Sequence, residues 1–385
     1  MGPKRPRKTV HLWSASPREE TVTALIKDIR DDPLLWLIAL VPVVLVAQLV
    51  APDAHTLLFV LSVVAIVPLA ALLSRATESV SARTGDMIGG LLNATLGNLT
   101  ELLIALAALR AGQYVLVKAS IAGAIVTNAL FMLGMSFLLG GLVHHVQEYN
   151  RNIARLQASL LFVATIAVLL PSVLADKDAT AGQPAFTHAL SLGLSVILIA
   201  IYALGLLFSL KTHREFFGGA EHAQEGETQW PIGLALATLA VVTVLVALVS
   251  EVFVESVQQA ATSLGLSPAF VGFIIVALVG AAAEMVSAFS AARKNRLDLS
   301  VGIALGSASQ IALFVAPVLV LLSYLIGPTP MDLQFWPGAV AMMLVATMVT
   351  SLVTNTGRSA WFVGALITAV YLIFAMTLYL LPPRV

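Results

Sequence analysis

Long apolar stretches separated by short polar joints make up most of the chain. A helix crosses a bilayer core of about 30 Å with about 20 apolar residues. Windows of that length predict eleven spans in the 385 residues, at 33–50, 56–74 (continuing to about 83), 86–109, 117–140, 154–174, 186–210, 231–260, 267–292, 298–326, 335–355 and 360–381. The pattern predicts an all-α polytopic membrane protein.

The composition supports a membrane protein and excludes several other classes. The chain is 59% hydrophobic and 11% charged, with a mean hydropathy of +0.94, whereas soluble domains carry roughly a quarter charged residues. Soluble enzymes, nucleic-acid-binding proteins and disordered chains are therefore excluded, and the lipid bilayer is the expected environment. The chain has no cysteine, which excludes disulfides and thiolate metal sites. No cofactor is expected.

The distribution of basic residues predicts the orientation in the membrane. With eleven spans, 17 of the 21 Lys and Arg residues fall on the side of the N-terminus and 4 on the other side. Cytoplasmic loops carry the excess of basic residues in membrane proteins, so the N-terminus is expected in the cytoplasm and the C-terminus outside. Residues 1–32 precede a full span instead of a cleavage site, which indicates a tail and not a signal peptide. The short tail and loops favour a prokaryotic inner (plasma) membrane.

Two segments of the sequence match at a constant offset of 183 residues. GNLTELLIALAALR at 97–110 aligns with GAAAEMVSAFSAAR at 280–293. The shared positions include an intramembrane glutamate, a glycine one turn before it and a terminal arginine; they are Gly97/Gly280, Glu101/Glu284 and Arg110/Arg293, and the match resumes at Gly123/Gly306. These coincidences indicate an internal duplication.

The two copies are expected to cross the membrane in opposite directions. Glu101 lies in the third predicted span and Glu284 in the eighth, so an odd number of spans separates them. Inverted repeats that meet at the midplane are typical of secondary transporters. The predicted organisation is a cytoplasmic tail (1–32), a peripheral first transmembrane helix (33–50), a first repeat (56–210), a cytoplasmic connecting loop (211–230) and a second, inverted repeat (231–381).

Five glutamates within apolar stretches are the candidate functional residues: Glu78, Glu101, Glu251, Glu255 and Glu284. An acid inside a span is expected to face a protein interior or a water-filled path, to pair with a cation, or to hold a proton. Glu101 and Glu284 occupy the same position in the two matching segments, which favours a functional role for them. The alternative is a structural role, in which neighbouring donors hydrogen-bond each buried glutamate. Glu251 and Glu255 share one helix face and form a candidate proton or gating relay, with a solvated helix end as the alternative; Glu78 is comparable.

Oxygen donors surround the two repeated glutamates. Each has a glycine one turn before it, and such a glycine allows a helix to break and frees carbonyl oxygens to act as ligands. The candidate metal-binding residues are Glu101, Glu284, Gly97, Asn98, Thr100, Gly280, Asn128, Ser307 and Gln310. Oxygen-only sites suit hard cations such as Ca²⁺. A carboxyl group away from water takes up a proton readily when no cation is present, so cations and protons would compete for this site.

A pair of glycines in the ninth predicted span is expected to serve helix packing, unlike the glycines before the two repeated glutamates. Gly302 and Gly306 form a small-xxx-small motif. Such motifs allow the backbones of two helices to approach closely. The motif therefore predicts close helix packing and not a ligand-binding loop.

The motifs GGLLNATLGNLTELLIALAAL (89–109), KASIAGAIVTN (118–128), GAAAE (280–284) and GIALGSASQIALFVAP (302–317) resemble the calcium/proton antiporters of the cation/calcium exchanger superfamily. The resemblance covers about residues 56–381. It implies eleven helices, with two inverted five-helix repeats after a peripheral first helix, and a site built around Glu101 and Glu284. The chain departs from this family at Ala281, where asparagine is usual, and at Met285, where histidine is usual. Half of a symmetric amide pair is therefore missing.

The leading hypothesis is a Ca²⁺/H⁺ antiporter that works by alternating access, with Ca²⁺ and H⁺ as substrates. A sodium- or potassium-coupled calcium exchanger is the nearest alternative, and a passive cation channel is a further one. An intramembrane protease would need paired mid-span aspartates, or a serine with a membrane histidine, and the spans contain no such aspartate pair. The sequence leaves open whether the chain forms a homo-oligomer.

Overall fold

The computed structural model describes residues 28–30, 32–174, 184–213 and 230–381. Most of the expected cytoplasmic tail and most of the expected connecting loop 211–230 lie outside these residues. Both expectations therefore stay predictions.

The first half of the described chain is a series of helices that follow the predicted spans. They are η1 (Pro33–Ala39), α2 (Leu40–Val50), α3 (His55–Arg83), α4 (Asp86–Leu96), α5 (Leu99–Arg110), α6 (Tyr114–Val126), η2 (Thr127–Met132), α7 (Leu133–His144), α8 (Arg151–Leu174), α9 (Pro184–Leu207) and η3 (Phe208–Thr212), with strand β1 (Val146–Glu148) after α7. The π-helical turn η2 links α6 and α7 into one continuous span.

The second half is a further series of helices. They are α11 (Ile232–Ser263), α12 (Pro268–Phe270), η6 (Val271–Val276), α13 (Ala277–Gly280), α14 (Ala282–Arg293), α15 (Leu297–Gln310), η7 (Ile311–Val315), α16 (Ala316–Ile326), α17 (Pro337–Thr354) and α18 (Trp361–Leu380), with strand β2 (Arg358–Ala360) before α18. Helices α5 and α14 both have 12 residues. The first and last residues of α14 lie 183 positions after those of α5, and α15 begins 183 positions after α6.

The helices confirm the predicted fold class. In the described part of the chain, nine helices are long and apolar enough to cross a membrane, and there are up to eleven if each of two bent pairs is one span. The bent pairs are the third and eighth predicted spans, which contain Glu101 and Glu284. The chain is an all-helical polytopic membrane protein.

Both bent spans break next to the repeated glycine. Ile88–Leu96 and Leu99–Arg110 meet at 43°, and Pro268–Gly280 and Ala282–Arg293 meet at 58°. At the breaks, Asn98 has φ −101° and ψ 33°, and Ala281 has φ −81° and ψ 5°. A glycine without a side chain tolerates such a bend, and the interrupted ladder leaves backbone groups of the half-helices available to other partners.

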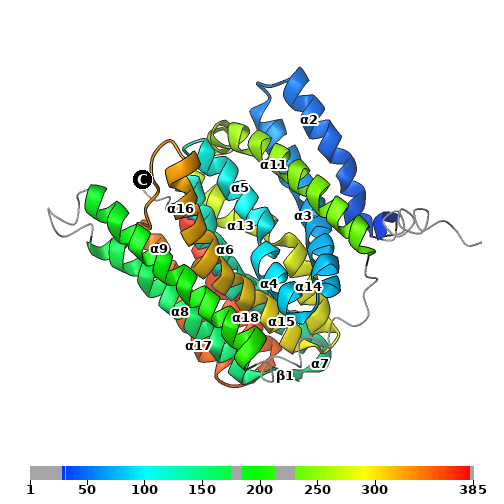
Figure 1. Ribbon diagram of the computed structural model, residues 1–385, viewed down its shortest axis with the longest axis vertical. Helices are drawn as coiled ribbons and strands as arrows, with labels where there is room; N and C mark the ends of the chain where they lie inside the picture. The colour runs from blue at the N-terminus through cyan, green and yellow to red at the C-terminus, as the bar shows by residue number, and fades with distance from the viewer. Residues whose placement is uncertain (1–27, 31, 175–183, 214–229, 382–385) are drawn as a thin grey trace, which may run out of the picture.

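The helices form two groups with the broken spans between them (Figure 1). On one side α3 packs along α11, and α2 lies outside this pair at the edge of the molecule. On the other side α8 packs on α17 and on α9, and α9 packs on α16. The two halves of the chain are therefore interleaved, because α3 and α8 belong to one half and α11 and α17 to the other.

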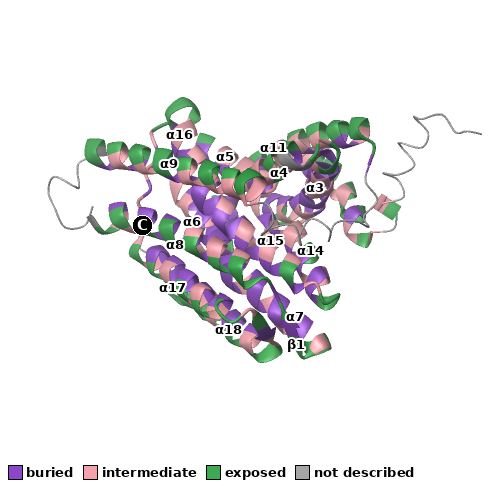
Figure 2. Cartoon of the chain, turned by 60° about the horizontal axis from the view of Figure 1, so that its bottom comes forward, coloured by how far each residue is buried: buried purple, intermediate pink, exposed green. Residues whose placement is uncertain are grey.

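The buried residues line the interior helices, and the apolar side chains on the outside face away from the protein. Figure 2 shows buried residues along α6 and α17 and exposed ones along α9 and α11. Leu49 and Val50 of α2 are 84% and 78% exposed. An apolar surface of this kind on a helical bundle is typical of contact with lipid.

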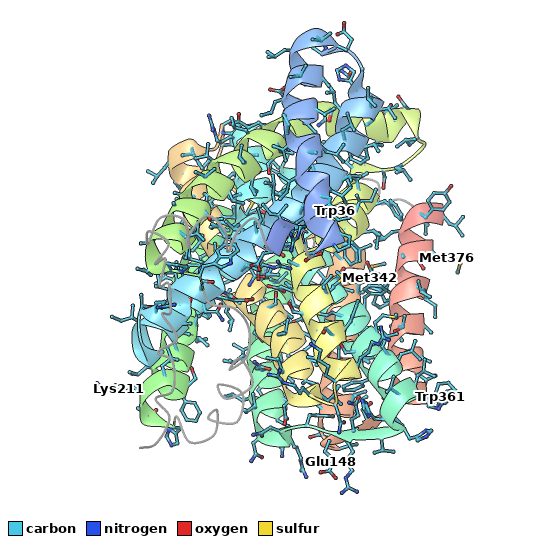
Figure 3. The ribbon with its side chains drawn as sticks, turned by 90° about the vertical axis from the view of Figure 1, so that its right-hand side faces the viewer. Trp36, Glu148, Lys211, Met342, Trp361 and Met376 are labelled. Atoms are coloured by element: carbon cyan, nitrogen blue, oxygen red, sulfur yellow. The ribbon has the colours of Figure 1, made fainter. Side chains whose placement is uncertain are left out.

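One end of the molecule combines the end of α9 with a short two-stranded sheet. β1 and β2 pair antiparallel, with Gln147 opposite Ser359. Lys211, Glu148 and Trp361 lie toward this same end in Figure 3, whereas Met376 lies farther along α18, away from it.

Candidate cation-binding site

The two repeated glutamates each begin the second half of a broken span. Glu101 lies in the first turn of α5 and Glu284 in the first turn of α14. Carboxylates near a helix N-terminus are stabilised by its partial positive charge. The helix breaks therefore fix both acids at equivalent positions within the bundle.

The glycine of each repeat brings the break into contact with the other repeat. A Cβ placed on Gly280 would lie 2.9 Å from Cγ of Glu101 and 3.2 Å from its Oε1. A Cβ on Gly97 would lie 3.5 Å from Oε1 of Gln310. The Glu101 side chain thus lies directly against the break that precedes Glu284, which brings the two halves of the predicted site together.

A chain of hydrogen bonds joins the break after Gly97 to the helices of the second half. Nδ2 of Asn128 donates to Oγ of Ser307 at 2.8 Å, and this hydroxyl donates to Oδ1 of Asn98 at 2.6 Å. Nδ2 of Asn98 donates in turn to Oε1 of Gln310 at 2.6 Å. Asn98 and Asn128 are 1% and 0% exposed and Gln310 is half-buried, so four predicted residues form one polar network that extends from the interior to the cavity wall.

Several oxygens at the site have no hydrogen-bond partner among the described residues. They are Oε1 of Glu101, Oε2 of Glu284 and Oδ1 of Asn128, all buried. A buried acceptor without a partner costs about 1–3 kcal/mol. A bound cation or a proton removes that cost, and two carboxylates with an amide oxygen match the ligand chemistry of a hard cation. Thr100 is buried in the same turn as Glu101.

A cavity of about 380 Å³ reaches the site from one side of the bundle. From the site itself, Gly97, Glu284, Ser307 and Gln310 contribute to its wall. The remaining wall comes from the ends of α3 and α9, the start of α8 and the facing surfaces of α4 and α15. This is the end of the molecule that contains Lys211, next to the lining residue Leu210. Glu284 is therefore accessible from this side.

Glu78 lies in the wall of the same cavity. Its Oε1 accepts a hydrogen bond of 3.0 Å from Oγ of Ser74, one turn earlier in α3. Its carboxyl group is near enough to Glu284 for the two charges to interact. The structure thus brings Glu78 together with one of the two repeated glutamates.

Glu251 and Glu255 lie apart from this cavity, and neither contributes to its wall. Glu251 forms a salt bridge of 3.1 Å with Arg110 at the end of α5, and its side chain is 49% exposed. Oε2 of Glu255 accepts a hydrogen bond of 2.7 Å from Gln48 of α2. Their predicted relay role stays a prediction.

The side of the bundle opposite the cavity is covered by the segment between α16 and α17. Met331 and Leu333 are 2% and 0% exposed. Nζ of Lys118 forms a salt bridge of 2.5 Å with Asp332. Backbone N–H groups of this segment donate to serine hydroxyls on three helices; the pairs are Met331 to Ser323, Leu333 to Ser191 and Phe335 to Ser172. The segment is therefore fixed firmly over this side.

Tyr202 is a cavity residue that the sequence did not single out. Its hydroxyl donates to the carbonyl of Ala94, near the end of α4, at 2.5 Å. Its ring stacks on Phe314 with 5.2 Å between the centroids. A tyrosine in an apolar helix gives no distinctive signal, because tyrosines are also common where helices meet lipid headgroups.

The described residues contain no group of three or more His, Asp and Glu side chains arranged to hold a metal ion. A cation at the site would therefore depend on the carboxylates of Glu101 and Glu284, together with amide, hydroxyl and backbone oxygens.

Comparison with known proteins places the chain in a family. The sodium/calcium exchanger protein family matches over residues 54–211 and again over 234–380. The Ca²⁺/H⁺ antiporter of Aphanothece halophytica is 38% identical over 339 residues, which cover 84% of this chain and 90% of that protein. The Ca²⁺/H⁺ antiporter ChaA of Bacillus subtilis is 41% identical over 328 residues, covering 84% and 92%. This chain belongs to the Ca²⁺/H⁺ antiporter family.

Its fold agrees with that of a solved structure. The structure of native YfkE superposes with a TM-score of 0.79 at 38% identity, covering 90% of this chain and all of that one. The family resemblance inferred from the motifs is thereby confirmed.

The two helix breaks of this antiporter-family chain differ in one side chain. Ala281 is fully buried there, at the position equivalent to Asn98. The amide of Asn98 bonds both Ser307 and Gln310, whereas a methyl group has neither donor nor acceptor. Met285 is also buried. The polar network at the first break therefore has no side-chain counterpart on Ala281.

Proposed function

We propose that this protein is a secondary active transporter that exchanges cytoplasmic Ca²⁺ for protons by alternating access. The observation that carries the proposal is the pair of repeated glutamates, each with an unpartnered buried oxygen: Glu284 lies in the cavity wall, and Glu101 lies against the helix break that precedes it. The Ca²⁺/H⁺ antiporters of Aphanothece halophytica and Bacillus subtilis, which the chain matches over 90% and 92% of their length, support it.

The proposed Ca²⁺ ligands come from both helix breaks. Glu101 and Glu284 supply the negative charge, and Asn128 supplies a neutral oxygen without another partner. Asn98, Ser307 and Gln310 hold the surrounding geometry through their hydrogen bonds, while Thr100 and the backbone at Gly97 and Gly280 complete the proposed set. Since Ca²⁺ takes about 6–8 oxygens, backbone carbonyls and water are expected to fill the remaining positions.

Proton coupling follows from the same carboxyl groups. Two neighbouring carboxylates removed from bulk water are costly when both are charged and nothing neutralises them. Either a divalent cation or protons can supply the neutralisation, so occupation by one excludes the other. Binding Ca²⁺ on one side and protons on the other then drives exchange without a separate proton channel.

Glu78 is proposed as a relay between the cavity and Glu284. It contributes to the cavity wall and interacts electrostatically with Glu284. A carboxylate in this position attracts cations and can pass protons to its neighbour.

The proposed orientation follows the distribution of basic residues. With 17 of 21 on the N-terminal side, the cavity faces the cytoplasm, and the segment around Asp332 closes the outer side. We propose a prokaryotic inner membrane as the location. We further propose that residues 56–210 and 231–381 are inverted repeats, with 33–50 as a peripheral helix. A homo-oligomer is left open.

Transport into sealed vesicles tests the proposal. Purified protein is reconstituted, and ⁴⁵Ca²⁺ uptake is measured under an imposed pH gradient, a sodium gradient or a potassium gradient. Uptake that follows the pH gradient alone is expected. Uptake that needs sodium or potassium and survives a proton uncoupler would identify the coupled calcium exchanger instead, and a conductance without any coupling would identify a channel.

A further inference from the structure

The Gly302-xxx-Gly306 motif of α15 is not packed against a helix in this structure. A Cβ placed on Gly302 would meet no atom within 4 Å, and one on Gly306 would meet only the side-chain Nε2 of Gln157, at 3.2 Å. Both glycines contribute to the cavity wall. The close helix packing that the motif predicts is thus absent from this conformation.

The equivalent positions of the first repeat are closely packed. At the 183-residue offset, Gly302 corresponds to Ala119 and Gly306 to Gly123, both in α6. A Cβ on Gly123 would lie 2.5 Å from Cα of Phe273 in η6. The Cβ of Ala119 lies 2.6 Å from the position of a Cβ on Gly272. Here the backbones of α6 and η6 touch, and all four residues are buried.

The segment equivalent to η6 in the first half is part of α4. Gly272 corresponds to Gly89 and Phe273 to Gly90. Gly90, Gly302 and Gly306 all line the cavity, which separates this part of α4 from α15. The same pair of elements is therefore closed in one repeat and open in the other.

We propose that the Gly302–Gly306 surface of α15 is the docking surface for α4 in the conformation that closes the cavity. The inference rests on the proposed exchange function, because exchange by alternating access requires such a conformation. Packed interfaces change between discrete arrangements instead of deforming continuously. The α6–η6 contact is the available example of the closed arrangement, and it indicates that Gly90 then lies against Gly306, and Gly89 against Gly302.

The α6–η6 contact, taken as the example of the closed arrangement, makes different predictions for substitutions at Gly302 and Gly306. Ala119 already carries a methyl group in the packed repeat, so Gly302→Ala is expected to dock normally, whereas Gly302→Leu is too large. Gly123 admits no Cβ against Phe273, so Gly306→Ala is expected to prevent docking. In the open conformation described here, a Cβ on Gly302 meets no atom within 4 Å and the residue lines the cavity, and the methyl group of Gly306→Ala meets only a flexible side chain.

A size series measures this difference. Gly193→Leu is the matched control, because Gly193 is a helical glycine on the exposed face of α9 and also meets nothing within 4 Å. Gly302→Leu and Gly306→Ala are expected to bind ⁴⁵Ca²⁺ in detergent with an affinity within about threefold of that of the wild type. Their exchange rate is expected to be at least about tenfold lower, because the added side chain clashes only in the closed conformation. Gly302→Ala and Gly193→Leu are expected to exchange at near the wild-type rate.

A reversible version excludes misfolding as the cause. The chain has no cysteine, so Gly302→Cys introduces a single thiol. Methyl methanethiosulfonate converts it to a disulfide bearing a methylthio group and releases methanesulfinate, and dithiothreitol reduces this disulfide back to the thiol. Modification is expected to stop exchange while Ca²⁺ binding persists, and reduction is expected to restore exchange.

Wild-type exchange in fully modified Gly302→Cys, or in Gly302→Leu, would overturn the docking proposal while leaving the proposed function intact. Failure of the proposed function appears separately, as unmodified wild-type protein that shows no uptake driven by a pH gradient.

Discussion

Replacing Ser307 by alanine removes the centre of the polar network at the first helix break. The hydroxyl accepts from Nδ2 of Asn128 at 2.8 Å and donates to Oδ1 of Asn98 at 2.6 Å, so Ser307→Ala breaks two hydrogen bonds at once. Side-chain hydrogen bonds between membrane helices contribute about 0.6 kcal/mol on average and up to about 1.7 kcal/mol. Each buried group left unpaired adds about 1–3 kcal/mol. The two bonds together contribute about 1–3 kcal/mol and the two unpaired groups about 2–6 kcal/mol, so we expect the free energy of unfolding to fall by at least about 3 kcal/mol.

The assay is equilibrium unfolding in mixed micelles, followed by the fluorescence of the five tryptophans. Ser159→Ala is the matched control, because Ser159 is exposed and its hydroxyl donates only to the carbonyl of Arg155 in the same helix; an effect within about 0.5 kcal/mol is expected. A double-mutant cycle with Asn98→Ala isolates the Ser307–Asn98 pair. A loss in Ser307→Ala no larger than in Ser159→Ala, with no coupling in the cycle, would refute the network.

Three further substitutions probe contacts around the site. Gly280→Ala places a methyl group against Glu101, and we expect Ca²⁺ affinity in equilibrium binding to fall about tenfold; unchanged affinity would contradict the contact. Lys118→Met leaves Asp332 without its cation, and the unfolding assay should register a loss of about 1.5–3 kcal/mol, mostly recovered in Lys118→Met/Asp332→Leu. Tyr202→Phe removes the hydrogen bond to the end of α4, and the unfolding assay should detect a loss of about 1 kcal/mol in the free energy of unfolding. An unchanged free energy of unfolding would show that this hydrogen bond does not stabilise the fold.

The positions of the helices were predictable from the sequence because hydropathy and helix length determine them. All eleven predicted spans correspond to helices or bent helix pairs of the described chain. The bends were only partly foreseen. The glycine before each glutamate indicated a weak point, but whether a helix bends there depends on contacts such as Gly280 with Glu101, which come from distant parts of the chain.

The candidate site was predictable where the repeat carried the signal. Asn98, Asn128, Ser307 and Gln310 form the polar network, as their polar character within apolar spans suggested. The glutamates outside the repeat could not be separated in this way. Glu78 faces the cavity, whereas the i,i+4 pair in α11 shares a face that sequence spacing alone cannot orient toward or away from the cavity.

The orientation of Tyr202 was equally inaccessible from the sequence. Its role follows from a hydrogen bond to the carbonyl of Ala94, a group that carries no sequence signature. The open cavity between α4 and α15 is likewise a property of one conformation, and two repeats with matching sequences give no indication of which one is open.

Proton release on Ca²⁺ binding tests most directly whether one pair of carboxyl groups serves both ions. Purified protein in weakly buffered detergent solution is titrated with Ca²⁺ while a pH indicator records the protons set free, as expected when a metal displaces protons from its ligands. We predict release that is lost or strongly reduced in Glu101→Gln and Glu284→Gln and retained in Glu148→Gln, whose carboxylate is exposed beside Arg358. Ca²⁺ binding without proton release in the wild type, or full release in either variant of the repeated pair, would contradict the shared site.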